Sequence, residues 1–335
     1  MAVRDDVVAL FVCSAYQYDN YGTLENELKI HSDVPQPKLD AHQVRIKVQS
    51  AAVNPFDRLV MEGMGQAFLG IVPSTEKPFT IGIDGAGKVV EIGSDVNRLA
   101  VDDEVYLMTP VTAFGTLAEY VVAEEEFVAV KPRNLDFNEA AAVPSVALTA
   151  YAGMFRHAKL QKDQTVLILG GSSSVGMYAV QFAHALGARV IATTSTRNVE
   201  LVKSLGADQV IDYTKEKWLE IVEPHSVDAF YDCGAEDSAW NDGAQLVLKK
   251  ATGRFITISP MAQPVAESKF GAILIGEVYN TDPSADKLDV ITQYIESGTV
   301  KPVIDTVYPF EKAMDAYAKL KTKRARGKLV LQVHQ

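Results

Sequence analysis

The sequence is poor in cysteine, with only Cys13 and Cys233 among its 335 residues. Two cysteines so far apart build neither a disulfide framework nor a Cys-x-x-Cys metal motif. Unpaired thiols are typical of a reducing compartment. The histidines show no spacing typical of metal ligands, so we expect surface or core histidines at positions His31, His42, His157, His184, His225 and His334.

The sequence also lacks net positive charge and long apolar runs. Its 32 Lys and Arg residues face 43 Asp and Glu residues, a net charge of −11. A non-specific nucleic-acid binder needs a cationic face, so we expect no nucleic-acid partner. No window reaches the roughly 18 apolar residues of a membrane span. Asp5 and Asp6 precede the short apolar run 7–12, whereas a secretory signal begins basic. We therefore expect no membrane partner and a cytoplasmic protein.

Short strands dominate the first 125 or so residues. They are separated by Gly, Pro and Asp, and frequent turns between short strands favour a small barrel or sandwich. A length of 335 residues allows about two domains. The clearest strands are expected at Val44–Val48, Gly87–Glu91, Asp103–Leu107 and Ala118–Val122.

The pattern changes near residue 139. Glu139–Ala158 is rich in alanine and predicts a helix interrupted at Pro144. Alternating strands and helices follow from Thr165, which predicts an α/β fold with a doubly wound parallel sheet covered on both faces. The expected strands are Thr165–Leu169, Arg189–Thr194, Gln209–Asp212, Val227–Asp232 and Arg254–Ser259, and the expected helices are Val175–Leu186, Val199–Leu205, Ala239–Leu248 and Asp286–Ser297.

The last segment again contains strands. Val303–Tyr308 and Lys328–Val333 flank a predicted helix at Phe310–Leu320. We expect this segment to rejoin the first part of the chain.

A small-residue turn follows the strand Thr165–Leu169 and leads into an apolar helix. Strand, tight turn and helix form the phosphate-holding element of dinucleotide folds, whose fingerprint is Gly-x-Gly-x-x-Gly. Gly171 and Gly176 fill the outer positions, and Ser173 fills the middle one. Unpaired N–H groups and the helix dipole favour a pyrophosphate there, while Ser acting only as an N-cap is the alternative. The surrounding strands and helices favour cofactor binding by Gly171, Ser172, Ser173, Ser174, Val175 and Gly176.

The end of the next strand indicates which dinucleotide is bound. An NAD site places Asp or Glu there, roughly 20 residues after the glycines. This sequence has no carboxylate at that point, and instead offers Ser195 and Arg197, which suit a 2′-phosphate. We therefore predict NADPH, the alternative for Arg197 being a solvated loop charge. Tyr213 is predicted to flank the adenosine end, although such a tyrosine more often only packs.

Taken together, the motifs resemble the medium-chain dehydrogenase/reductase superfamily, and within it the zinc-independent quinone oxidoreductase (zeta-crystallin-like) branch. The matching stretches run through nearly the whole chain in a specific order and spacing. They are residues 53–57 (VNPFD), 82–87 (GIDGAG), 115–120 (GTLAEY), 139–144 (EAAAVP), 148–151 (LTAY), 205–208 (LGAD) and 327–331 (GKLVL).

The resemblance implies a GroES-like β-barrel domain, residues 1–128 and 299–335, split around a Rossmann domain, residues 129–298. It implies hydride transfer from NADPH to quinones or related conjugated carbonyls. It also implies a homodimer, or a dimer of dimers, joined through the Rossmann sheets.

Several site roles follow from the resemblance. Thr149 is placed near the nicotinamide, and Tyr213 and Arg324 on the 2′-phosphate side. Cys233 and Ser259, which stand at the ends of two expected strands, complete the cofactor candidates. Asn54 becomes the polar residue in the substrate cleft that would bond the acceptor oxygen, although a turn-former before Pro55 is equally reasonable. Asp57 and Asp84 would orient neighbouring groups or cap loops.

The sequence departs from its relatives in three places. The relatives usually have glycines at Ser173 and Ser174, and often Tyr and Arg where Leu59 and Met61 stand, which predicts a more apolar cleft. Zinc-bearing relatives have Cys at Asn54 and Gly-His-Glu at residues 82–84, so we predict no metal site. The apolar cleft leaves a 2-alkenal or enoyl reductase as the alternative activity, and a weakly catalytic NADPH-binding sensor as an alternative of another class.

Overall fold

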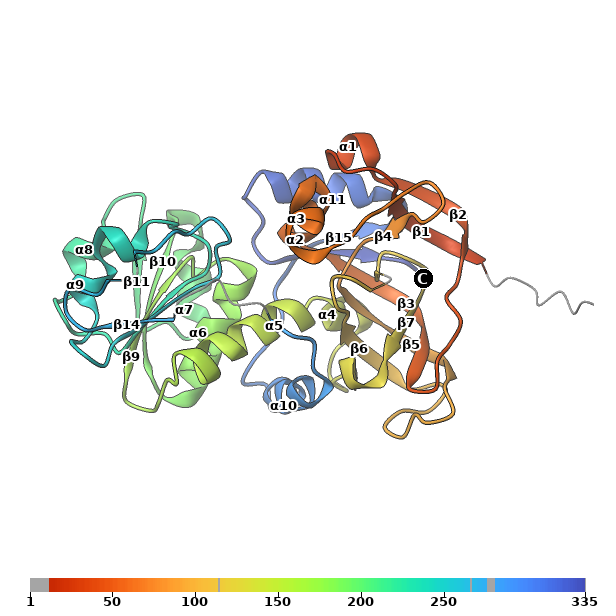
Figure 1. Cartoon of the computed structure of the whole chain (residues 1–335). Coiled ribbons are helices and arrows are strands. Elements are labelled where there is room, and N and C mark those ends of the chain that lie inside the picture. Colours follow the sequence, from red (N-terminus) through yellow and green to blue (C-terminus); the bar gives the residue numbers. More distant parts are fainter. Residues whose placement is uncertain (1–11, 114, 266, 276–280, 335) are drawn as a thin grey trace, which may run out of the picture.

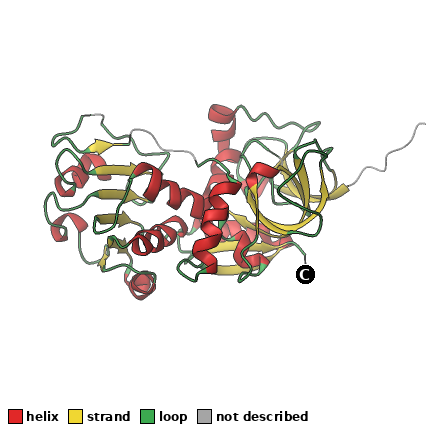
Figure 2. Ribbon diagram, turned by 90° about the horizontal axis from the view of Figure 1, so that it is seen from below, coloured by secondary structure: helices red, strands yellow, loops and turns green. Residues whose placement is uncertain are grey.

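The computed structural model describes residues 12–113, 115–265, 267–275 and 281–334. Most of the apolar run 7–12 therefore lies outside the described residues. Two strand regions lie at opposite ends of the molecule, with helices between them (Figure 1 and Figure 2). Within the described part of the chain, we find no helix both long and apolar enough to cross a bilayer.

One strand region is a parallel sheet in the order β11-β10-β9-β12-β13-β14. All of its paired strands run parallel, which confirms the predicted doubly wound sheet. The order starts in the middle and moves outward on both sides, as in dinucleotide-binding folds. The strands are β9 Thr165–Leu169, β10 Arg189–Thr194, β11 Gln209–Asp212, β12 Ala229–Asp232, β13 Arg254–Thr257 and β14 Ile273–Leu274.

Both faces of this sheet are buried because β9 is apolar at every position after Thr165. Val166 and Ile168 point into the core that contains helix α6, Ser174–Leu186, whereas Leu167 and Leu169 point into a second core with Trp218 and Trp240. Alternation of side chains along a strand explains this division. The other helices of this part are α7 Val199–Ser204, α8 Trp218–Ile221, α9 Gln245–Val247 and α10 Ala285–Glu296, with 3₁₀-helix η4 Thr196–Asn198 and π-helix η5 Trp240–Ala244.

The other strand region contains a seven-stranded sheet and a three-stranded sheet. In the first, the order is β15-β16-β3-β5-β6-β8, with β7 also paired to β3; in the second it is β2-β1-β4. The strands are β1 Val12–Tyr18, β2 Lys29–Pro35, β3 Gln43–Val53, β4 Phe79–Thr80, β5 Asp84–Ile92, β6 Glu104–Met108, β7 Tyr120–Glu124, β8 Val128–Val130, β15 Ile304–Pro309 and β16 Lys328–Gln332.

The C-terminal strands rejoin the first part of the chain, as predicted. β16 pairs antiparallel with β3, Leu329 lying opposite Val53, and β15 pairs parallel with β16. Around these sheets lie α1 Leu24–Glu27, α2 Pro55–Leu59, α3 Gly65–Leu69 and α11 Ala313–Lys321, with π-helix η1 Val60–Met64 and 3₁₀-helices η2 Glu125–Phe127 and η6 Phe310–Lys312.

The two regions are linked by the helices that follow residue 136. The predicted helix over Glu139–Ala158 is divided into α4 Phe137–Ala141, α5 Pro144–Tyr151 and π-helix η3 Ala152–His157. The interruption falls at Pro144, as expected, because proline favours the first position of a helix. In Figure 1, α4 and α5 lie between the two strand regions.

Helix α10 contacts the barrel although it lies inside the predicted Rossmann range. Tyr106 on β6 donates its hydroxyl hydrogen to the Leu288 carbonyl at 2.7 Å, and Arg98 pairs with Asp286 and Asp289. The domain boundaries at 128/129 and 298/299 stay a prediction.

Asp57 ties the helix after β3 to helix α11. Its Oδ2 accepts hydrogen bonds from the Asn54 backbone N–H at 2.8 Å and from the Tyr317 hydroxyl at 2.9 Å. Burial raises the pKa of this carboxyl from 3.8 to about 7. The folded protein therefore binds a proton at Asp57 that the unfolded chain releases between these two values, so folding loses stability as pH rises through that window.

We expect Asp57→Asn to weaken this pH dependence. An amide keeps an acceptor oxygen for both donors and does not ionise. Between pH 5 and 7.5, the wild type should lose more unfolding free energy than the variant, by on the order of 2 kcal/mol. Urea denaturation at both pH values measures the difference. Asp33→Asn, at an exposed position of β2, is the control. Parallel profiles for wild type and Asp57→Asn would contradict the assignment.

Candidate active site

The turn between β9 and α6 has room only for glycine at its two outer positions. A Cβ on Gly176 would lie 2.1 Å from the Gly170 carbonyl oxygen, and one on Gly171 would lie 2.9 Å from the Ala192 Cβ. The backbone therefore passes very close to itself where the strand meets the helix. This is the close strand–helix packing that dinucleotide turns require.

Ser173 fits the middle position without backbone strain. Its φ is −71°, and the positive φ of the turn, 75°, falls on Gly170. The Ser173 hydroxyl oxygen accepts a hydrogen bond from the Gly176 N–H at 3.0 Å, so Ser173 is the N-cap of α6. The capping role that the sequence offered as an alternative is thus present.

Capping does not close the turn to an anion. Ser174 and Val175 are the first two residues of α6, and first-turn N–H groups have no acceptor within a helix. Together with the helix dipole, they suit a pyrophosphate. The Ser172 hydroxyl oxygen instead accepts from Thr194 at 2.7 Å and from Asn198 at 3.2 Å.

The end of β10 lies directly beside this turn. The Gly171 N–H donates to the Thr193 carbonyl at 2.8 Å, and Asn198 Nδ2 also reaches the Ser195 hydroxyl oxygen at 3.4 Å. Asn198 is buried and was not predicted. Its position, directly before the predicted helix Val199–Leu205, was the only signal in the sequence; the structure places it at the end of η4 and at the N-cap of α7.

Arg197 is exposed and joins two distant segments. One of its terminal nitrogens donates to the Arg324 carbonyl oxygen at 2.9 Å. This contact brings the loop before β16 against the end of β10. Arg324 therefore lies beside Arg197, and this contact is made by its backbone carbonyl.

A carboxylate does stand nearby, but on the next strand. Asp212, at the end of β11, accepts hydrogen bonds from Thr196 at 2.6 Å and from Thr214 at 2.7 Å, and these bonds lower its pKa. Lys215 is also paired with it. The neighbouring Tyr213 is 58% exposed, and its N–H donates to the Thr194 carbonyl at 3.0 Å, so its ring lies open to solvent beside β10.

The remaining cofactor candidates lie at the ends of other elements. Cys233 follows β12, its N–H donating to the Leu169 carbonyl at 3.1 Å, and burial raises the pKa of its thiol well above the usual value. Ser259, after β13, donates its hydroxyl hydrogen to Asp237. Thr149 lies on α5, where its hydroxyl bonds to that of Thr281 at 2.8 Å and its carbonyl accepts from Tyr231 at 3.3 Å.

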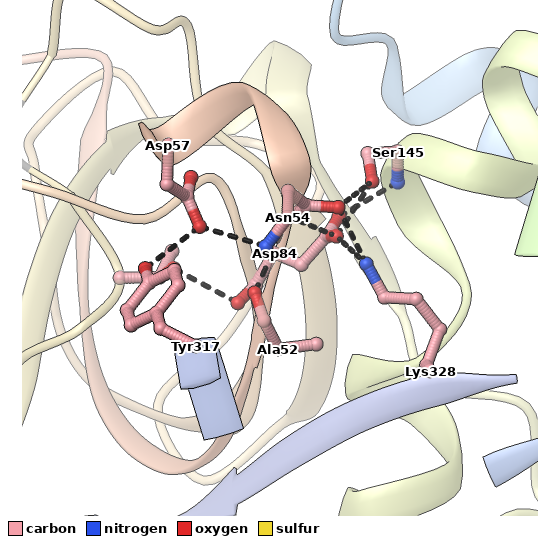
Figure 3. A network of polar contacts seen from close by, with 8 residues as sticks. Ala52, Asn54, Asp57, Asp84, Ser145, Tyr317 and Lys328 are labelled. Carbon is pink, nitrogen blue, oxygen red and sulfur yellow. Dashed lines mark hydrogen bonds and ion pairs between the residues drawn. The ribbon is translucent and has the colours of Figure 1, made fainter. Parts of the chain in front are cut away.

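A second polar cluster surrounds Asn54, between the barrel and α5 (Figure 3). The Lys328 ammonium donates to Asn54 Oδ1 at 2.6 Å and to Asp84 Oδ2 at 2.8 Å. Asn54 Nδ2 donates to Asp84 Oδ2 at 3.0 Å and to the Ala52 carbonyl at 3.3 Å. Both amide hydrogens of Asn54 are thus committed to the protein, and a bond to an acceptor oxygen would have to replace one of them.

The sequence assigned no role to three members of this region, although one stands in a quoted motif and another directly follows one. Lys328 follows Gly327, and Ser145 directly follows Pro144. Tyr317, the partner of Asp57, stands on the apolar face of α11.

Met61 does not line a cleft as predicted. Its side chain is fully buried and belongs to the barrel core. The expectation of a more apolar cleft therefore rests on Leu59 alone.

The positions that hold zinc ligands in zinc-bearing relatives do not fit a metal here. Asn54 and Asp84 surround an ammonium group, which excludes a second cation from the same place. Among the described residues, no group of three or more His, Cys, Asp or Glu side chains is arranged to hold a metal ion.

Comparison with known proteins agrees with this geometry. Residues 40–133 match the family described as alcohol dehydrogenase GroES-like domain, and residues 205–331 match the family described as zinc-binding dehydrogenase. The quinone oxidoreductase of Coxiella burnetii has a similar structure, with a TM-score of 0.81 at 28% identity, covering 96% of this chain and 99% of that one.

Two plant proteins are more similar in sequence. The 2-methylene-furan-3-one reductase of Solanum lycopersicum is 37% identical over 95% of this chain and 78% of its own length. The chloroplastic NADPH-dependent alkenal/one oxidoreductase of Arabidopsis thaliana is 36% identical with the same coverage. The chain therefore belongs to the medium-chain dehydrogenase/reductase superfamily, and within it to the zinc-independent quinone oxidoreductase branch.

Proposed function

We propose that this enzyme transfers hydride from NADPH to quinones or related conjugated carbonyls without zinc. The observation that carries the proposal is the combination of two neighbouring features. The glycine-bounded turn 171–176 suits the pyrophosphate of a nicotinamide cofactor, and the adjacent end of β10 offers Ser195 and an exposed Arg197 in place of a carboxylate.

The residues of this chain divide the work of binding. The first-turn N–H groups of Ser174 and Val175 hold the pyrophosphate, and Ser195, Arg197 and Arg324 receive the 2′-phosphate. Tyr213, Cys233 and Ser259 border the same cofactor. When bound, the nicotinamide supplies the hydride chemistry, and the protein supplies orientation and electrostatics.

Thr149 is the residue that we place beside the nicotinamide ring. Asn54 and Asp57 are kept as the catalytic candidates, Asn54 to bond the acceptor oxygen and Asp57 to orient its neighbouring groups. Since Asn54 and Asp57 are both buried and the Asp57 carboxyl is held by the Asn54 N–H and the Tyr317 hydroxyl, we assign product protonation to water.

A second candidate activity is the reduction of 2-alkenals or enones. It is favoured by the names of the two plant relatives, which are 37% and 36% identical to this chain. Quinones and alkenals present the same conjugated carbonyl, so one site serves both reactions. A weakly catalytic NADPH sensor is the outcome if binding occurs without turnover.

We also propose a homodimer, or a dimer of dimers, and a cytoplasmic location. The edge position of β14 in the parallel sheet supports the dimer, because an edge strand presents unpaired backbone groups. The two cysteines, both free thiols, support a reducing compartment. Light scattering and cell fractionation test these two points.

An acceptor comparison tests the activity. With NADPH at saturation, we expect kcat/KM for 9,10-phenanthrenequinone to exceed that for trans-2-hexenal by about tenfold or more. The reverse order would assign the alkenal activity. Tight NADPH binding with no oxidation on either acceptor would leave the sensor, and absence of NADPH binding would refute all three.

The 2′-phosphate site is tested by Arg197→Ala. Loss of one charge-assisted contact should raise the Kd for NADPH about tenfold and leave the Kd for NADH unchanged. Fluorescence titration measures both constants. Lys203→Ala, which removes another exposed cation from the next helix, is the matched control. Equal losses for the two cofactors would show that the phosphate pocket lies elsewhere.

The turn is tested by Gly176→Ala. The added methyl group meets backbone rather than a flexible side chain, so the turn must open and binding of both NADPH and NADH should be lost. Circular dichroism establishes that the variant is folded, and Ser204→Ala, in an exposed position, is the control. A folded variant with wild-type affinity would contradict the assigned site.

A further inference from the structure

Asp84 gathers four hydrogen bonds from three distant segments onto one buried carboxylate. Its Oδ1 accepts from the Ser145 backbone N–H at 2.7 Å. Its Oδ2 accepts from the Ser145 hydroxyl at 2.6 Å, from Asn54 and from Lys328. Asp84 is fully buried and Lys328 is 4% exposed, so the two charges neutralise each other away from solvent. Figure 3 shows the side chains converging.

Two of these bonds reach the first turn of helix α5. Ser145 is the second residue of the helix, and the preceding Val143 offers no side-chain cap. The N–H groups of a first helical turn need acceptors from outside, and an anion is the favoured one. Asp84, a barrel residue 61 positions earlier, therefore caps the helix that leads into the parallel-sheet part.

The capped helix also carries Thr149. Residues four apart lie on the same face of a helix, so Thr149 stands one turn beyond Ser145. At this turn, the helix is held from the other side, because the Tyr231 hydroxyl on β12 donates to the Thr149 carbonyl. Thr149 thus lies between a contact to the barrel and a contact to the parallel sheet.

We propose that Asp84, with its charge balanced by Lys328, is a positioning residue. It fixes the position of α5 relative to the barrel, and thereby the placement of Thr149 against the nicotinamide. The inference rests on the proposed function, because it assigns Thr149 to the bound cofactor. Asp84 itself touches neither cofactor nor acceptor in this scheme.

The geometry separates this role from binding affinity. In the proposed binding mode, the pyrophosphate and the 2′-phosphate lie at the turn 171–176 and at the end of β10, and the hydrogen bonds of these segments go to partners other than Asp84. Losing the cap should therefore change how the nicotinamide is oriented, and leave the affinity for NADPH nearly unchanged.

The first experiment compares Asp84→Asn with the wild type. In the variant, an NH₂ group replaces one carboxylate oxygen, and it cannot accept a hydrogen bond as that oxygen does. The cap is therefore broken with almost no change in side-chain volume. We expect kcat to fall about tenfold to a hundredfold, as for a small misplacement of reacting groups, with the Kd for NADPH within about twofold of the wild-type value. Ser145→Ala, which keeps the backbone N–H bond, should show a smaller loss.

A second readout does not depend on turnover. The emission of bound NADPH reports the surroundings of the nicotinamide, and it should change in Asp84→Asn while the Kd does not. If the wild type binds NADPH but reduces no acceptor, the proposed function fails and the emission still tests the positioning role. Unchanged kcat, or unchanged emission in an inactive protein, would overturn the inference.

Lys328 is tested by chemical rescue. Lys328→Ala removes the balancing charge, and added methylammonium or ethylammonium should restore part of kcat by replacing its N–H donors. Tetramethylammonium, which has the charge and no N–H group, should not. Equal effects of the two kinds of cation would overturn the role of Lys328.

Lys131→Met is the matched control for loss of a buried ammonium. Lys131 is 7% exposed, donates to the Leu135 carbonyl and pairs with Glu104, neither of which belongs to α5. We expect this variant to melt earlier than the wild type while keeping its kcat and bound-NADPH emission. A loss of kcat equal to that of Asp84→Asn would show that general destabilisation, rather than positioning, accounts for the effect.

Discussion

A carboxylate and an ammonium group lose their hydration together where Asp84 meets Lys328. This is possible because Asn54 and Ser145 donate further hydrogen bonds to the carboxylate and Asn54 Oδ1 accepts one from the ammonium. Removing two charges from water costs several kcal/mol for each ion, and only good geometry with additional hydrogen bonds offsets that cost. The offset here requires Asn54, Ser145 and Lys328 to arrive at one point. The barrel strands β5 and β16 and the helix α5 are therefore placed by a shared electrostatic requirement.

The serine-rich turn shows how a departure from a motif is accommodated. The middle position of the turn, Ser173, keeps a negative φ, and the conformational freedom of glycine is needed three residues earlier, at Gly170. Ser173 then uses its hydroxyl to cap α6, and Ser172 uses its own to join β10. The serines stabilise the turn while the backbone N–H groups of the first helical turn stay available for an anion.

The parallel sheet could be predicted from the sequence because its strands are apolar, continuous and locally defined. Strands β9, β10 and β11 have the predicted bounds, and the division at Pro144 was foreseen. The π-helical turn η3 and the kinks at Gly63 in η1 and Gly243 in η5 were not predicted, since over a few residues their pattern differs little from that of an α-helix. The Asp84–Lys328 pair was also missed, because its partners are 244 positions apart and no local pattern joins them.

The return of β16 to β3 has a consequence for synthesis. Leu329 and Leu331 complete the barrel core, and Val330 between them belongs to the core of the parallel-sheet part. Strand β3 therefore lacks one of its neighbouring strands until residues roughly 280 positions later have been made, and contacts between such distant segments form slowly. During synthesis, the strands of the parallel sheet can therefore pair with one another before β16 joins the barrel. The first part of this chain to be made is, on this account, the last to be finished.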